Sequence, residues 1–402
     1  MKILQLTNKV PWPPKEGGTI AVFSLSKGFF LHGNKVTVLA MNTGRTHFET
    51  DSIPEYLTKE INFQVVDMPY SNSVFSVLSN LFFSKLPYRA TRYIQKEYKD
   101  SLISLLQKEK FDIIQFEGLY VCPYIHIARE YSNALFSYRV HNIEHQIRQD
   151  LHLIHGIKSF YEKIMAKRLK KFEISFLNKY DTLVSITERD GLTWDKLGNH
   201  KPRYTSQTGI NLPLLVPTVK NLEYPSLFHI GAMDWYPNQE GLLWFIHSCW
   251  PSIREKYPKL KFYIAGRNIP NWLKNTFANA KIEFVGEVDD AYSFISSKAI
   301  MIVPVLSGSG IRIKIIEGMA LGKAVVSTSI GSEGIPAIDH ENILIADNPE
   351  AFIKNIEELI SNQILFKKIC KNAVDFICKK FDNLTIVENL LKFYEGHLNK
   401  KN

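Results

Sequence analysis

The sequence predicts an α/β protein built from two domains, each with a parallel β-sheet. Its 402 residues exceed the usual size of one hydrophobic core, which makes two domains the default expectation. Short β-branched and aromatic runs alternate with amphipathic stretches along the chain, and this alternation is typical of strand–helix–strand units. A Pro-rich stretch of little periodicity, residues 209–225, separates two such series and predicts an inter-domain linker.

The first series defines an N-terminal domain of residues 1–208. Its apolar runs predict strands at 2–7, 35–41, 61–66, 111–116, 134–140 and 181–186. The second series defines a C-terminal domain of residues 226–375, with strands at 226–231, 260–266, 281–286, 299–305 and 324–328. Residues 376–402 are helical by their apolar spacing, and we expect them to pack back on the N-terminal domain. Since parallel sheets bind ligands beyond the carboxyl ends of their strands, two facing domains predict one cleft.

The chain has a net charge of +9, and much of the basic excess lies between residues 145 and 171. Such a run is ordinarily a solvated helix face, and otherwise it binds an anionic partner. We find no nucleic-acid motif and expect no nucleic acid partner, so an anionic membrane surface is the better candidate. Aromatic residues beside basic ones between residues 74 and 96 also suit a membrane interface.

The length of the apolar runs and the spacing of the cysteines indicate the cellular compartment. The most apolar stretches are shorter than the roughly 20 residues that cross a bilayer, and the first apolar run is too short for a signal peptide. The four cysteines are scattered and have no C-x-x-C spacing, which suits a reducing compartment. We expect a cytoplasmic protein that is peripheral on the inner face of the membrane.

The most informative stretch, residues 303–328, predicts an anion site. A buried strand ends at Pro304, a loop rich in Gly and Ser follows, and a helix is expected to begin near Gly310. Loop amides and a helix N-terminus attract anions through unpaired N–H groups and the positive end of the dipole. Arg312 and Lys314 stand in the first turn, where cations oppose the dipole, and a docked diphosphate would compensate them.

Two questions about this helix stay open. An ion pair between Lys314 and Glu317, neighbours at i,i+3, is the alternative to a bound anion. Arg312 and Lys314 would also point to nearly opposite sides of a regular helix. Either the helix begins later than Gly310, or only one of the two cations reaches the anion.

The stretch resembles the signature of retaining group 1 glycosyltransferases, whose GT-B fold has two Rossmann-like domains facing each other across a cleft. The signature E-A-M-A-x-G-x-P-V corresponds to residues 317–325. In the family, two glutamates flank seven residues: the first contacts the donor sugar and the second the nucleotide ribose. Glu317 matches the second, whereas the first would fall at Ser309. A subgroup with G-x-G-x-R-x-K-x-x-E shares this departure and matches the chain from Gly308 through Gly310 to Glu317.

Three further stretches carry the resemblance. Residues 231–245 are similar to the first strand–helix turn of the donor domain and include the candidate ligand Asp234; Met233 and Gln239 stand near where many members have Arg and Lys. Gly286 to Val288 lies close to where the family holds the nucleotide base. Gly17 and Gly18 resemble the Gly-rich loop after the first strand, where the backbone approaches the donor phosphate or sugar.

The resemblance implies transfer of a sugar from a nucleotide-diphosphate donor, with retention, to a glycan or lipid-linked acceptor of surface polysaccharide. The demand is to stabilise charge on the leaving diphosphate, which Arg312 and Lys314 would meet without a metal or other cofactor. Two alternatives remain: a nucleotide-sugar epimerase or hydrolase of the same fold, and a non-catalytic nucleotide-sugar-binding paralogue. The donor sugar, the base, the acceptor and the oligomeric state are not predicted.

The stretch RVHNIEHQ, residues 139–146, matches the zinc motif H-x-x-E-H. The alternating run before it predicts a strand that ends at His141, which separates His141 from His145 and disfavours zinc. A histidine simply hydrogen-bonded at a strand end is one alternative. The resemblance favours another, because the family places a His near the transferred sugar. His141 would then contact a sugar hydroxyl, and Glu144 would lie on the acceptor side.

Overall fold

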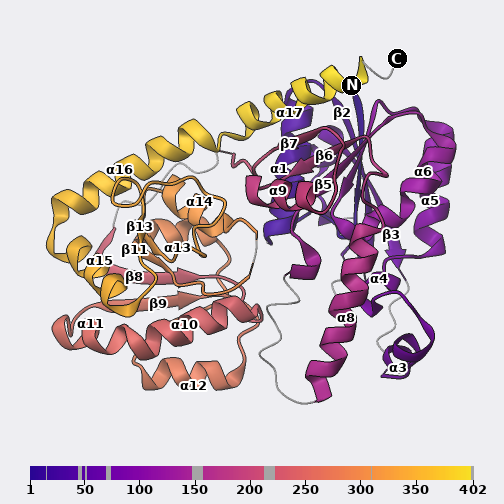
Figure 1. Cartoon of the computed structure of the whole chain (residues 1–402). Coiled ribbons are helices and arrows are strands. Elements are labelled where there is room, and N and C mark those ends of the chain that lie inside the picture. The colour runs from indigo at the N-terminus through magenta and orange to yellow at the C-terminus, as the bar shows by residue number, and fades with distance from the viewer. Residues whose placement is uncertain are drawn as a thin grey trace. The chain divides into compact units, whose positions relative to one another are not determined.

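The computed structural model describes residues 1–402 except Lys15, 44–47, 50–51, 69–73, 147–156, 212–221, Ser309 and 400–402. For residues 74–78 and 157–160 only the backbone is described. The chain divides into two compact units, one of Met1–Gly209 with Asn383–Asn402 and one of Ile210–Asp382 (Figure 1).

The first unit contains a seven-stranded parallel sheet of order β3-β2-β1-β4-β5-β6-β7 in its described residues. Its strands are β1 Lys2–Thr7, β2 Lys35–Thr43, β3 Ile61–Met68, β4 Ile113–Glu117, β5 Leu135–Val140, β6 Thr182–Ser185 and β7 Arg203–Thr205. Its helices are α1 Gly17–Leu31, α2 Glu55–Glu60, α3 Val74–Phe83, α4 Tyr88–Thr91, α5 Lys96–Lys108, η3 Leu119–Tyr124, α6 Ile125–Tyr131, α8 Ile157–Ile174, α9 Glu188–Lys196 and α17 Asn383–Leu398.

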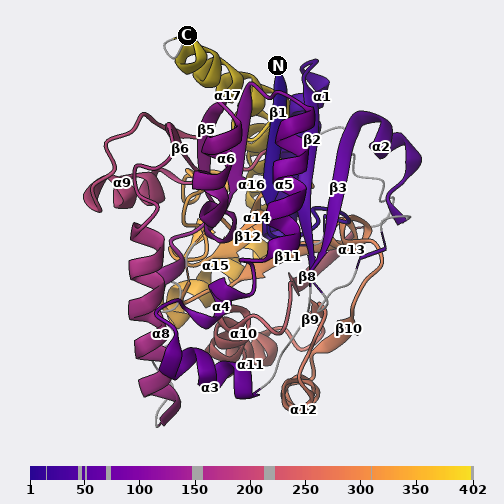
Figure 2. The same cartoon turned by 90° about the vertical axis from the view of Figure 1, so that its right-hand side faces the viewer.

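Alternating strand residues build a core on each face of this sheet. Leu4 and Leu6 face a cluster that includes residues of α5, α6 and α8, and both views show α5 beside α6 (Figures 1 and 2). Ile3 faces the opposite cluster, which holds residues of α1 and α17. A Cβ at Gly28 of α1 would lie 2.5 Å from Val387 of α17, so glycine allows these two helices to approach closely.

The second unit contains a six-stranded parallel sheet of order β10-β9-β8-β11-β12-β13 in its described residues. Its strands are β8 Glu223–Ile230, β9 Lys261–Ala265, β10 Glu283–Gly286, β11 Lys298–Val303, β12 Ala324–Ser327 and β13 Leu344–Ile345. Its helices are α10 Tyr236–Ser248, α11 Trp250–Lys256, α12 Asn271–Asn279, α13 Ala291–Ser297, α14 Ile313–Ala320, α15 Pro349–Ser361 and α16 Gln363–Lys380. Ile300 and Ile302 pack with α10 and α15, whereas Met301 and Val303 pack with α14, so helices cover both faces.

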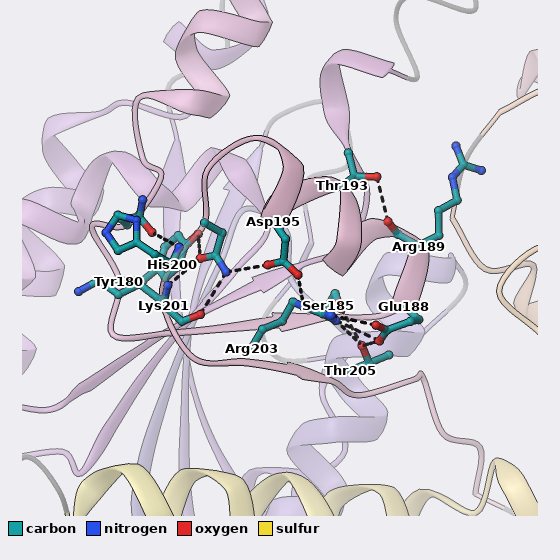
Figure 3. A network of polar contacts seen from close by, with 12 residues as sticks. Tyr180, Ser185, Glu188, Arg189, Thr193, Asp195, His200, Lys201, Arg203 and Thr205 are labelled. Carbon is teal, nitrogen blue, oxygen red and sulfur yellow. Dashed lines mark hydrogen bonds and ion pairs between the residues drawn. The ribbon is translucent and has the colours of Figure 1, made fainter.

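All eleven predicted strands are present, and two strands were not predicted. β13 has two residues and β7 has three, too few for a periodic signal. Polar contacts join β7 to α9 (Figure 3). Arg203 pairs with Glu188 at 2.8 Å and with Asp195 at 2.9 Å, and the Thr205 hydroxyl donates to Glu188 at 2.6 Å.

Three predicted boundaries differ from the structure. The helix expected to begin near Gly310 begins at Ile313. The expected linker 209–225 overlaps β8, which already starts at Glu223, and residues 212–221 lie outside the described residues. The boundary at residue 376 falls inside α16, because Phe376 and its neighbours continue the helix to Lys380, and α17 belongs to the first unit.

Candidate functional site

The loop between β11 and α14 is shaped by two glycines. Gly308 and Gly310 have φ of 93° and 88°, in the left-handed region that favours glycine. A Cβ at Gly308 would also lie 3.2 Å from Pro237, at the start of α10. Ser309, between them, lies outside the described residues. The loop therefore needs both glycines of the predicted motif to take this path.

Arg312 closes the loop and does not lie inside the helix, because it is the residue that precedes α14. Its side chain turns back, donating from Nη2 to the Gly308 carbonyl at 3.1 Å and from Nη1 to the Gly310 carbonyl. The guanidinium lies 5.2 Å from the ring centroid of Trp235, and the residue is buried. Arg312 thus stabilises the loop through its carbonyls, and its charge lies beside the N-terminus of α14.

Lys314 lies among polar side chains of the second unit. Its Nζ donates to Oδ1 of Asn238 at 2.9 Å and lies 3.3 Å from Nε2 of His229. Burial, with Arg312 as a nearby like charge, lowers the pKa of Lys314 to about 7. In the described part of the chain Lys314 makes no ion pair, and the alternative pair with Glu317 does not form. A cation without an anionic partner is what an anion-binding site requires.

The tautomer of His229 follows from its partners. Nδ1 lies 2.8 Å from the Ile302 carbonyl, which can only accept, so Nδ1 carries the proton. Burial and the charge of Lys314 lower the pKa of His229 well below its usual value, so the ring is neutral. Nε2 is then an acceptor that faces the Lys314 ammonium and helps to hold it.

Close backbone packing at the carboxyl end of β8 leaves room for Lys314. A Cβ at Gly231 would lie 2.7 Å from Nζ of Lys314 and 2.8 Å from Nδ2 of Asn238, so any larger residue would displace these two side-chain ends. Helix α10 begins at Tyr236 without a side-chain cap, and its third residue, Asn238, bonds Lys314, so the positive end of the α10 dipole lies near this ammonium. The site therefore combines the Lys314 charge with the N-termini of α10 and α14.

The turn before α10 contains Asp234, and Gln239 in the first part of the helix bonds back to this turn. The exposed carboxylate of Asp234 accepts from Nδ2 of Asn268 at 3.1 Å. Gln239 donates to the Met233 carbonyl at 2.6 Å and so closes the turn. Gln239 therefore has a structural role where many group 1 members have a basic residue.

Glu317 is also half-buried, one turn after Lys314. Burial raises the pKa of Glu317 to about 7, against the nearby charge of Lys314 and a hydrogen bond of 3.2 Å from the Tyr292 hydroxyl of α13. The carboxylate is therefore only partly ionised at neutral pH, and Tyr292 fixes its orientation.

Gly286 and Val288 follow β10. Gly286 has φ of 87°, a Cβ added to it would have nothing within 4 Å, and its carbonyl accepts from Gly266 N at 2.8 Å. Val288 is half-buried. These residues lie at the same sheet edge as Gly231, whose N–H donates to the Ala265 carbonyl at 3.1 Å.

The first unit brings a second group of predicted residues together. His141 follows β5, and its Nε2 lies 2.6 Å from Oε2 of Glu117, the last residue of β4. A Cβ at Gly18 would lie 4.0 Å from Nδ1 of His141. Gly17 and Gly18 form the first turn of α1 and are exposed, so the expected glycine loop is a helix N-terminus. Gly18 is a helical position whose missing side chain leaves space beside Nδ1 of His141.

Glu117 was not predicted from the sequence. It is buried, and it accepts from Nε2 of Gln5 at 2.9 Å, from Nη1 of Arg139 at 3.3 Å and from Gln115. Burial opposes its ionisation, but Arg139 and the bond to His141 outweigh burial and lower the pKa of Glu117 to about 2. A glutamate at the end of a predicted strand was the only signal the sequence offered.

The two histidines of the H-x-x-E-H stretch bind different glutamates. Nδ1 of His145 lies 2.6 Å from Oε2 of Glu173, in α8, while His141 pairs with Glu117. Glu144 accepts from the Tyr120 hydroxyl at 3.0 Å, and burial raises the pKa of Glu144. Among the residues that the structure describes, no group of three or more His, Cys, Asp and Glu could hold a metal ion.

Residues 224–362 match the family model of group 1 glycosyl transferases. This segment contains the loop at Gly308, Lys314 and Glu317, and its match confirms the predicted resemblance to group 1 glycosyltransferases at the level of the family model. Over 413 residues the chain is 23% identical to a 44.6 kDa protein of the cps region of Klebsiella pneumoniae, covering 97% of this chain and 99% of that protein.

Solved structures resemble the whole chain. HepE of Anabaena in complex with UDP-glucose has a TM-score of 0.70 at 14% identity, covering 98% of this chain and 100% of that chain. Sucrose-phosphate synthase from Thermosynechococcus elongatus has a TM-score of 0.74 at 14% identity, with coverage of 98% and 99%. At such identities the likeness concerns the fold, which is that of GT-B glycosyltransferases, and the predicted fold class is confirmed.

Proposed function

We propose that this protein transfers a sugar from a nucleoside diphosphate sugar to a glycan or lipid-linked acceptor, with retention and without a metal ion. The observation that carries the proposal is Lys314, a half-buried cation without a carboxylate partner in the described residues, inside a group 1 glycosyltransferase domain. The UDP-glucose complex of HepE supports a nucleotide sugar as the donor. The relative of a cps region supports a role in surface polysaccharide assembly.

The diphosphate is assigned to Lys314 and to the N-termini of α10 and α14. These groups stabilise the negative charge that grows on the leaving diphosphate as the glycosidic bond breaks. Arg312 adds charge next to the same helix N-terminus, while its hydrogen bonds hold the loop of Gly308 and Gly310. Glu317 is assigned to the nucleotide ribose, with Tyr292 orienting its carboxylate. Gly286 and Val288 are assigned to the base and Asp234 to the donor. Ser309, which the resemblance also assigns to the donor, lies outside the described residues.

In the first unit, His141 is assigned to a hydroxyl of the transferred sugar. Gly17 and Gly18, the exposed first residues of α1, are assigned to the donor phosphate or sugar, and a Cβ at Gly18 would lie 4.0 Å from Nδ1 of the imidazole. Glu144, which is bound to Tyr120, is assigned to the acceptor.

The donor is tested by thermal shift with a panel of nucleoside diphosphate sugars, because a ligand that binds only the native state raises Tm. The stabilising donor is then incubated with the enzyme, with and without an acceptor extract. We expect transfer only with acceptor and an unchanged donor without it. Epimerised or rapidly hydrolysed donor in the absence of acceptor would replace the transferase by an epimerase or hydrolase. Binding without turnover in either mixture would favour the non-catalytic paralogue.

The proposed donor site is tested by Arg312→Ala, Lys314→Ala and Glu317→Ala in the same transfer assay. We expect each substitution to lower kcat/KM, with Lys314→Ala the most severe because it removes the ammonium assigned to the diphosphate. Undiminished turnover in all three variants would remove the site from the second unit.

We also propose that the enzyme works at the cytoplasmic face of an anionic membrane, through the surface formed by the end of α3 and the exposed side of α8. Phe82 and Phe83 are 74% and 89% exposed. Arg168 of α8 donates to the carbonyls of Asn80 and Leu81 at 3.1 and 2.7 Å, so the two helices lie together. Exposed aromatic side chains beside lysines are typical of a membrane interface.

The basic part of this surface is one stripe of α8. The exposed lysines, at i, i+4, i+7 and i+8, are Lys163, Lys167, Lys170 and Lys171. In the described residues no helix is long and apolar enough to span a bilayer. Each basic residue near an anionic surface contributes about 1 kcal/mol, so two lysine-to-alanine changes should weaken binding roughly 30-fold.

Vesicle co-sedimentation checks the membrane surface. We expect binding to vesicles with phosphatidylglycerol, little binding to phosphatidylcholine alone, and loss of binding in the Phe82→Ser/Phe83→Ser variant. Ile364→Ser is the matched control, because Ile364 is 83% exposed on the other unit. Equal binding to both vesicle types would refute the proposal, as would equal loss in the control.

A further inference from the structure

His141 is held by a buried carboxylate from a neighbouring strand. Nε2 of the imidazole lies 2.6 Å from Oε2 of Glu117, and the side chain of Glu117 is only 1% exposed, against 17% for His141. Strands β4 and β5 are neighbours in the sheet. Glu117 is the last residue of β4, and His141 directly follows β5. The buried carboxylate of Glu117 therefore fixes the orientation of the His141 imidazole.

The hydrogen bonds of Glu117 fix which nitrogen of His141 carries a proton. Oε1 accepts from the side-chain amides of Gln5 and Gln115, and Oε2 accepts from Arg139. With its pKa lowered to about 2, Glu117 is ionised and can only accept. Nε2 of His141 must therefore be the donor, so in the singly protonated ring Nδ1 is an acceptor.

The open side of the imidazole is the Nδ1 side. In the described part of the chain Nδ1 has no hydrogen-bond partner, and a Cβ added at Gly18 would lie 4.0 Å away. A side chain at position 18 would fill this space, so glycine keeps it open to a ligand. An acceptor nitrogen in such a place fits a hydroxyl donor.

We propose that Glu117 is a positioning residue, which holds His141 with Nε2–H bound and Nδ1 presented to a hydroxyl of the transferred sugar. The proposal rests on the proposed transferase function. Glu117 is itself held by a chain of hydrogen bonds. The Tyr394 hydroxyl of α17 donates to Gln115 at 2.6 Å, and Gln115 donates to Glu117. Through Gln115, the helix α17 thus helps to hold the Glu117 carboxylate, which orients the imidazole of His141.

Steady-state kinetics of Glu117→Gln and Glu117→Asp test the role in turnover. Loss of a group that orients an active-site histidine should lower kcat on the order of 10- to 100-fold, by analogy with outer-shell partners of metal-bound histidines. The donor KM should change less than about threefold, because orientation of the reacting sugar acts on turnover and not on ground-state binding. Glu117→Asp keeps the charge beside Arg139 but shortens the reach, so a purely structural role predicts normal turnover and positioning predicts a loss.

Selective ¹⁵N-histidine NMR provides a readout that does not depend on activity. The His141 signals, assigned by their disappearance in His141→Gln, should report protonated Nε2 and unprotonated Nδ1 in the native protein. Both Glu117 variants should change this pattern. Glu173→Gln is the matched control, since it removes an equally buried carboxylate 2.6 Å from His145 and should change only the signals of His145.

The outcomes separate this inference from the proposed function. An enzyme without transferase activity, but with the expected tautomer, would overturn the function and retain the geometry. Normal kcat in both Glu117 variants at equal folded fraction, or a His141 ring protonated at Nδ1 and bare at Nε2, would overturn positioning by Glu117.

Discussion

The Lys314 ammonium donates to the side-chain carbonyl of Asn238, 76 positions earlier in the chain, at 2.9 Å. This contact joins the helix after the glycine loop to the first turn of α10. It gives Lys314 a neutral partner, so the charge is held in place without being neutralised. An arriving diphosphate would meet an ammonium that is already oriented, and this arrangement has measurable consequences.

Lys314→Met should weaken binding of a nucleoside diphosphate sugar about 10- to 100-fold, because hydrogen bonds to charged groups contribute about 1.5–3 kcal/mol each. Isothermal titration calorimetry measures the change. Lys323→Met is the matched control: Lys323 is buried in the same unit but donates to the carbonyls of Ser296 and Lys298 at 2.8 and 3.0 Å. We expect a lower Tm and unchanged affinity in the control, and equal affinity in both variants would contradict the assignment.

Donor affinity should be greatest near pH 7 and fall on both sides. Lys314, with a pKa of about 7, loses its charge as pH rises, so binding weakens above neutrality. Glu317, also with a pKa of about 7, gains a proton as pH falls, and its carboxylate becomes a weaker acceptor for a ribose hydroxyl. Arg312, His229 and Tyr292 lie close to these two side chains, so they also influence the pH values at which the affinity falls.

Calorimetry from about pH 5.5 to 9 measures this profile with a nucleotide sugar, whose diphosphate diester has no group that titrates near neutrality. Lys314→Met should flatten the alkaline limb, and Glu317→Gln should flatten the acidic limb. A flat wild-type profile would show that neither group titrates against the donor.

His141→Ala should lower turnover more than nucleotide binding. Its imidazole is in the first unit, at the end of β5, whereas the assigned diphosphate and ribose contacts are in the second unit. We expect loss of kcat on the order of 10-fold or more, consistent with one hydrogen bond made in the transition state. Transfer assays combined with titration of the nucleoside diphosphate that the thermal-shift panel identifies check the difference, and wild-type turnover would defeat the assignment.

Gly241→Ala should destabilise the protein, and Gly396→Ala should not. A Cβ at Gly241 would lie 1.9 Å from the Pro304 carbonyl, so α10 must move from the end of β11, at about 1–3 kcal/mol. A Cβ at Gly396, within α17, would have nothing within 4 Å, so alanine should stabilise that helix by about 0.5–1 kcal/mol. Urea unfolding measures both, and equal changes would refute the packing argument.

The position of the strands was predictable because the apolar runs are long enough to show their period. Edge strands β7 and β13 were not, since two or three residues have no period and their pairing comes from neighbours. The start of α14 was also predicted three residues early. The left-handed φ of Gly310 and the side chain of Arg312, turned back on the loop, delay the helix to Ile313.

The sequence by itself determined the α/β fold class, the order of the predicted strands along the chain, and the Gly308–Glu317 motif, because each depends on residues close together in the chain. Only the tertiary structure decided which partners those residues have. Asn238 and His229 for Lys314, Tyr292 for Glu317 and Glu117 for His141 come from other strands and helices. Hydrogen bonds depend on distance in space, and the parallel sheets bring these ends together.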